Sequence, residues 1–198
     1  MSTPQEQPVS RPAQPKSPMP PLNSHLPPRR RQRLNYVKAG LTCLLGIYGL
    51  ICALNPKTFR ILDWVDLVFH EAGHAIFGFF GEFVGVLGGS LTQVLVPAMV
   101  TGYFLLYNQR WSGMVTLFWV GQSVVNVSVY VKDASTEALP LLGGDDTLHD
   151  WNWLLGKLHL LRWDQIVGNS IYLLGVVVIV ASIVGGLYLS REDQSAAE

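Results

Sequence analysis

Five long apolar stretches constrain the fold of this chain more than any other feature. Each has between 18 and 24 residues, and a helix of that length, at about 1.5 Å per residue, spans a hydrocarbon core of about 30 Å. Inside a bilayer every backbone polar group must find its partner within the segment, which favours helices. We therefore expect an all-α polytopic membrane helix bundle with about five transmembrane helices, at residues 37–54, 61–80, 84–107, 112–131 and 166–189.

The composition supports a membrane domain at residues 34–190. Only 14% of the residues are charged and 49% are hydrophobic, whereas soluble domains usually carry about a quarter charged residues. Residues 1–33 hold nine of the twelve prolines, and such a sequence buries too little apolar surface to offset the entropy of ordering. We expect a disordered tail there and a short polar tail at residues 191–198. The two cysteines match no metal or redox spacing and are interpreted as small apolar residues: Cys43 and Cys52.

Basic residues suggest an orientation for the bundle. A cluster of arginines just before the first apolar stretch favours a cytoplasmic N-terminus by the positive-inside rule: Arg29, Arg30, Arg31 and Arg33. With five crossings the C-terminus would lie on the opposite side. Gly88-Gly89-Ser90 and Pro97 leave an alternative, in which residues 84–107 form a re-entrant or broken helix. We expect a multi-pass protein of the bacterial inner membrane.

The second stretch is exceptional because it carries ionisable residues, which are costly inside a membrane and functional by default. His70 and His74 are four residues apart, so on a helix they share one face, with Glu71 beside them. In this HExxH pattern the two imidazoles bind Zn²⁺ and the carboxylate takes a proton from the metal-bound water. We predict His70 and His74 as zinc ligands and Glu71 as the catalytic base. The alternative is a buried polar network that only holds helices together.

A catalytic zinc usually has three protein ligands, and the polar loop at residues 132–165 offers candidates for the third. Asp145 follows two glycines, and His149 and Asp150 precede a tryptophan-rich stretch that we expect to form an interfacial helix. Asp145 and His149 rank about equally, ahead of Asp150. The alternative is a solvated acidic loop. Glu82 is a less favoured candidate.

Three further polar residues, Asp66, Gln122 and Asn126, are expected to support the site. Asp66 lies one turn before His70 and is predicted to accept its outer N–H, whereas Asp63 is interpreted as an ordinary helix N-terminal acid in the head-group region. Gln122 and Asn126 lie one turn apart on the fourth stretch. They either orient a substrate or form helix-to-helix hydrogen bonds.

The HEAGH sequence at residues 70–74, inside an apolar helix and followed by a glycine-rich turn and further membrane segments, resembles the site-2-type intramembrane zinc metalloproteases, especially their small bacterial relatives. The likeness covers roughly residues 61–150. It implies zinc on His70 and His74, Glu71 as general base, and membrane-spanning helices as substrates. Family members take their third ligand from an Asn-Pro-Asp-Gly or similar motif on a later membrane helix. This chain departs from that pattern, and its nearest candidate is Gly143-Gly144-Asp145-Asp146.

The leading hypothesis is a zinc-dependent peptidase that acts on a membrane-protein substrate or partner helix within the lipid bilayer. A second hypothesis is a non-proteolytic membrane protein with a structural or sensory metal site. A third is a lipid-directed metal hydrolase that uses the same residues. Membrane oxygenases and desaturases need many more histidines than the five present, and no feature indicates nucleic-acid binding.

Overall fold

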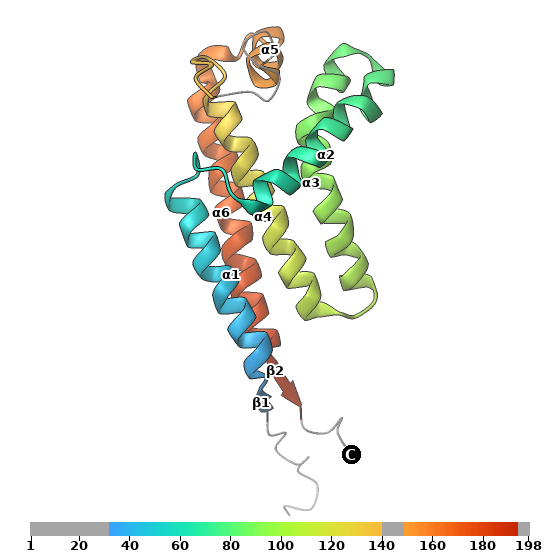
Figure 1. The fold of residues 1–198 in the computed structure, drawn as a ribbon, viewed down its shortest axis with the longest axis vertical. Coiled ribbons are helices and arrows are strands. Elements are labelled where there is room, and N and C mark those ends of the chain that lie inside the picture. The colour runs from blue at the N-terminus through green and yellow to red at the C-terminus, as the bar shows by residue number, and fades with distance from the viewer. Residues whose placement is uncertain (1–31, 140–148, 194–198) are drawn as a thin grey trace, which may run out of the picture.

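The structure, a computed structural model, describes residues 32–139 and 149–193 (Figure 1). Nearly all of the described chain is helical, which confirms the predicted all-α bundle. Its only strands within the described ranges are β1 (Gln32–Leu34) and β2 (Arg191–Asp193). The helices are α1 (Tyr36–Leu54), α2 (Ile61–Phe77), η2 (Gly78–Phe80), α3 (Glu82–Leu106), α4 (Arg110–Lys132), α5 (Asp150–Lys157), η3 (Leu161–Trp163) and α6 (Asp164–Leu189). Most of the expected N-terminal tail, and the end of the C-terminal tail, lie outside the described residues.

Four of the described helices are long and apolar enough to cross a membrane: α1, α3, α4 and the stretch Leu161–Leu189 that contains α6. Each coincides with a predicted span to within about five residues. The second predicted span differs, because α2 has only 17 residues and carries Asp63, Asp66 and Glu71. The described helices therefore provide four candidate spans, and α2 is a separate, shorter element.

The two strands fix the relation between the ends of the bundle. β1 pairs antiparallel with β2, with Leu34 opposite Arg191, and the Asn35 N–H donates to the Ser190 carbonyl at 2.7 Å. The start of α1 and the end of α6 consequently lie at the same end of the molecule (Figure 1). A chain that enters and leaves on one side crosses a membrane an even number of times. The pairing of β1 with β2 does not fit the expected C-terminus on the side opposite the N-terminus.

The helix pair α4 and α6 forms the centre of the bundle. An added Cβ on Gly121 of α4 would lie 2.8 Å from the backbone nitrogen of Ile179, and one on Gly175 of α6 would lie 2.8 Å from that of Val125. Such backbone contact is the usual role of small residues between membrane helices. α1 packs against this pair, with Phe118 buried between them. The centre is thus closely packed, and the remaining helices lie around it.

α2 and α3 form a hairpin on the other side of α4 (Figure 1). The hairpin is tight because a Cβ on Gly73 would overlap the carbonyl oxygen of Gly88. α3 runs unbroken from Glu82 to Leu106 with Pro97 inside it. The alternative of a re-entrant or broken third stretch is therefore not observed.

The predicted interfacial helix is α5, which lies across the ends of α3 and α4 remote from the strands (Figure 1). The Trp151 Nε1–H donates to Ser90 Oγ of α3 at 3.0 Å. Asn152 Nδ2 donates to the carbonyl of Ala134, just after α4, at 2.8 Å. These bonds hold Asp150, the first residue of α5, above the middle of α2.

Candidate metal centre

His70 and His74 lie on successive turns of α2, as their spacing predicts. Their ring centroids are 4.7 Å apart and the ring planes are nearly perpendicular, at 78°. Both rings point toward α3, at Gly89. A Cβ on that residue would lie 2.7 Å from His70 Nε2 and 2.6 Å from His74 Nε2, so only glycine leaves room for the two imidazoles here.

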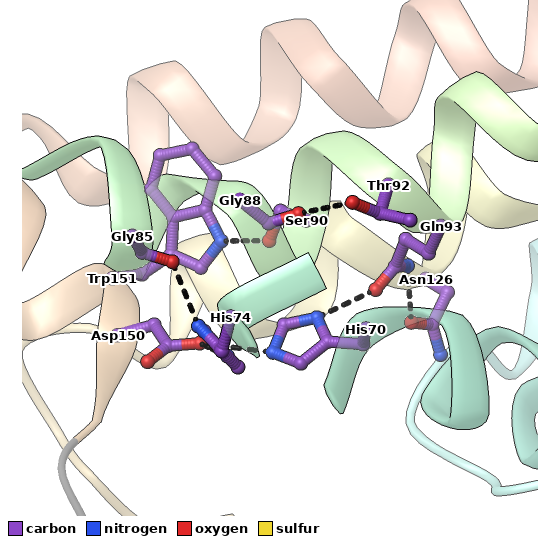
Figure 2. A network of polar contacts seen from close by, with 10 residues as sticks. All are labelled: His70, His74, Gly85, Gly88, Ser90, Thr92, Gln93, Asn126, Asp150 and Trp151. Carbon is purple, nitrogen blue, oxygen red and sulfur yellow. Dashed lines mark hydrogen bonds and ion pairs between the residues drawn. The ribbon is translucent and has the colours of Figure 1, made fainter. Parts of the chain in front are cut away.

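Asp150 completes a group of three ligand-type side chains (Figure 2). Its Oδ2 lies 2.9 Å from His70 Nε2 and 3.1 Å from His74 Nε2, and the three atoms lie within 4.8 Å of one another. Ligands at about 2.0–2.2 Å from a tetrahedral zinc are about 3.3 Å apart. A small outward movement would therefore fit these three atoms to a metal ion.

The Nδ1 atoms of both histidines act as hydrogen-bond donors. His74 Nδ1 lies 2.9 Å from the carbonyl oxygen of Gly85, and because a carbonyl only accepts, Nδ1 carries the hydrogen. His70 Nδ1 lies 2.8 Å from Gln93 Oε1. Gln93 Nε2 in turn donates to Asn126 Oδ1 at 3.1 Å and faces the Ser123 carbonyl at 3.4 Å.

Asp63 closes this hydrogen-bond chain from His70 through Gln93 and Asn126. Asn126 Nδ2 donates to Asp63 Oδ1 at 2.9 Å, and the carboxylate also accepts from Gln122 Nε2 at 2.8 Å and from the Arg60 N–H at 2.6 Å. An ionised carboxylate only accepts. The Asp63 carboxylate therefore fixes the orientation of the Asn126 amide, whose oxygen accepts from Gln93. Gln93 in turn presents its own oxygen to His70.

Three lone pairs consequently converge at one point. With both Nδ1 atoms donating, the Nε2 atoms of His70 and His74 present lone pairs toward Asp150 Oδ2. Only a cation, either a proton or a metal ion, makes such an arrangement favourable. Where that cation is a proton, burial alone would raise the pKa of Asp150, but the hydrogen bonds that His70 and His74 then donate outweigh burial and hold that pKa below its usual range.

A cavity of about 780 Å³ opens beside the group of three. Glu71 lines this cavity together with His70, His74 and Asp150. Its carboxylate is exposed and forms no hydrogen bond or ion pair with any residue in ranges 32–139 and 149–193. Glu71 is therefore free to interact with a water or a substrate next to the histidines.

The prediction that Asp66 accepts a hydrogen bond from His70 is wrong. Asp66 Oδ1 accepts from Trp119 Nε1 and from Ser123 Oγ, both at 2.8 Å, so it joins α2 to α4 and does not contact the histidines. Asp63 caps the start of α2 as interpreted. However, it is 7% exposed and lies between helices, not in a head-group region.

Of the two interpretations of Gln122 and Asn126, the structure favours helix-to-helix hydrogen bonding, since both side chains donate across to Asp63 of α2. Asn126 also lines the cavity. Glu82 is exposed in the first turn of α3 and is not part of the group of three.

Among the third-ligand candidates, the structure places Asp150 at the histidines, although the sequence ranked it third, behind Asp145 and His149. His149 immediately precedes α5 and lines the cavity, but it is not part of the group. Asp145 lies outside the described residues.

Gln93 was missed by the sequence analysis. It is the only Asn or Gln in the apolar stretch 84–107, and it lies four residues after Gly89, hence on the same face of α3. A lone buried amide in a membrane-length helix was the available signal.

No protein-family model, curated protein or solved structure matches this chain.

Proposed function

We propose that this protein is a zinc-dependent intramembrane peptidase that hydrolyses a membrane-protein substrate. The observation that carries the proposal is the convergence of three ligand-type atoms, from His70, His74 and Asp150, within 4.8 Å of one another. Glu71 lines the same large cavity and has no hydrogen-bond partner in the described part of the chain. Two imidazoles and one carboxylate form a common ligand set of catalytic zinc, which leaves a fourth position for water.

Each residue has a distinct part in the proposed reaction. His70, His74 and Asp150 would hold the ion, and a bound zinc would supply a water whose pKa is lowered to about 7. Glu71 follows His70 directly and lines the same cavity, so its carboxylate is placed to accept the proton of that water and pass it to the leaving amine. Gln93 and the Gly85 carbonyl keep both histidines in the tautomer that a metal needs.

The cavity supports a polymeric substrate. Its volume of about 780 Å³ is near the upper end of the usual range for ligand sites, about 300–1,000 Å³, and it has room for several residues of extended chain. Apolar walls from Trp64, Leu67 and Val129 accompany the polar group. Such a lining suits a segment with mostly apolar side chains.

The experiment combines metal analysis with two substitutions in the purified full-length protein. Glu71→Gln is expected to retain stoichiometric zinc and to lose hydrolysis of a reconstituted membrane-protein panel by at least 100-fold, because the base is removed and the ligands remain. His74→Ala is expected to lose both metal and activity. Glu82→Gln is the matched control, since it neutralises an exposed glutamate outside the group of three.

The same measurements distinguish the alternative functions. If Glu71→Gln keeps full biological function while His74→Ala abolishes it, the metal site is structural or sensory. Hydrolysis of lipid but not of protein substrates would indicate the lipid-directed hydrolase. An unmutated protein that binds no metal would contradict the whole proposal.

A further inference from the structure

The depth of the histidines is measured along α3. Their Nε2 atoms face Gly89, seven residues after Glu82, the first residue of the helix. At a rise of 1.5 Å per residue this is about 10 Å from the helix start, whereas the 25 residues of α3 extend about 37 Å. The group of three therefore lies near one end of the bundle and not at its middle.

The cavity opens among connecting segments at that end. Its lining includes Pro56 and Lys57, which follow α1, Asp133 and Leu139, which follow α4, and His149, which precedes α5. The cavity thus has polar loop residues at its edge in addition to apolar helix side chains.

Both ends of the described chain lie at the other end of the bundle. The β1–β2 pair is there (Figure 1). The α3–α4 connection is on the same side, because Trp111 at the start of α4 donates to Thr42 in the first half of α1. The cavity and the termini therefore face opposite sides of any membrane that the four long helices cross.

We propose that the metal centre is entered from the membrane surface opposite both termini, and that its substrate is a juxtamembrane segment at that surface. The substrate class rests on the proposed hydrolase function, whereas the side of entry does not. The position of Asp150 agrees with a metal centre near the membrane surface. Asp150 belongs to α5, which carries Trp151, Trp153 and Lys157, as helices at a membrane interface do.

The distribution of Lys and Arg residues indicates which side of the membrane the cavity faces. With four crossings, only five of the fourteen Lys and Arg residues fall on the cavity side: Lys57, Arg60, Lys132, Lys157 and Arg162. The other nine, including the arginine cluster before α1, fall on the side of the termini. By the positive-inside rule the termini are cytoplasmic, and the cavity faces away from the cytoplasm.

Single cysteines test the side of entry in a background with Cys43 and Cys52 replaced by alanine. Lys57→Cys reports the cavity edge, and Ala138→Cys reports the connection after α4. Gln109→Cys, an equally exposed position in the α3–α4 connection, is the matched control. In intact cells a membrane-impermeant maleimide is expected to label the first two at least tenfold faster than the third. Detergent should remove the difference. Equal labelling rates at positions 57 and 109, or faster labelling at position 109, would overturn the proposal.

The position of the cut bond tests the substrate class. Products from the reconstituted substrate panel are mapped by mass spectrometry. Cuts are expected within a few residues of the boundary on the non-cytoplasmic side, and cuts at mid-helix or at the cytoplasmic boundary would overturn the assignment. If no substrate is cut, the proposed function fails, whereas the labelling result still decides the side of entry.

Discussion

Gln93 is the residue whose substitution most directly tests how His70 is oriented. Gln93→Leu keeps the size of the side chain but removes the acceptor for His70 Nδ1, so the imidazole loses the partner that selects its tautomer. Loss of such a partner typically weakens metal binding by about 10–100-fold. Competition with a chromophoric chelator measures the affinity, and ¹⁵N shifts of the histidine ring report the tautomer.

Gln122→Leu is the control for this substitution. Gln122 is as buried as Gln93, at 2% exposed, and donates to the same Asp63, but it is not in the chain to His70. It should lower stability with little change in metal affinity. Equal losses of affinity in both variants would show that the hydrogen-bond chain does not orient His70.

Gly89 tests the space that the two imidazoles need. In Gly89→Ala the new Cβ would lie 2.6–2.7 Å from both Nε2 atoms, closer than real Cβ contacts. Metal affinity should fall at least tenfold, as measured by isothermal titration. Gly102→Ala in the same helix meets no atom within 4 Å and should leave binding unchanged. Unchanged affinity in Gly89→Ala would place the metal elsewhere.

Residue spacing in the sequence revealed only those parts of the site that lie on one helix. His70, Glu71 and His74 follow from helical periodicity alone. Asp150 is 80 positions from His70, and its distance to the histidines depends on how α5 packs, which no local pattern encodes. Asp66 does share a face with His70, but its side chain reaches Trp119 of α4, so helix packing decides its role.

Among the helices, α5 carries the third ligand, Asp150. The contacts that hold α5 on the bundle are therefore expected to affect metal affinity. Trp151→Phe removes the hydrogen bond to Ser90, whose net contribution is about 1 kcal/mol. Metal affinity should therefore fall about fivefold, in the same competition assay. Trp153→Phe, which keeps a ring next to Phe83, is the control and should bind as the unmutated protein does. A larger effect at position 153 would contradict this anchoring.

Helix positions were largely predictable, since length and apolarity alone locate α1, α3, α4 and α6. The exception is α2, where the same hydrophobic pattern suggested a fifth span. Two of its acids, Asp63 and Asp66, are buried against α4. A window of sequence that measures apolarity cannot detect this contact with another helix. The antiparallel pairing of β1 with β2 was likewise invisible, because it joins three-residue segments more than 150 positions apart.

For the molecule as a whole, the proposed four crossings would reverse the side on which the polar loop lies. Five crossings had placed residues 132–165 on the same side as the N-terminus. With an even number, reporters fused to the two ends should give the same compartment. Paired fusions to green fluorescent protein and alkaline phosphatase measure this, and opposite signals from the two ends would contradict four crossings.

The long separation between Asp150 and the two histidines has a mechanical consequence. An ion bound to all three would close a loop of 80 residues and staple the α2–α3 hairpin to the segment that leads into α6. Binding to the folded form alone, at 100 times the dissociation constant, adds about 2.7 kcal/mol to the free energy of unfolding. Chelation should therefore lower the melting temperature in detergent and, in hydrogen exchange, loosen the hairpin before the α4–α6 pair.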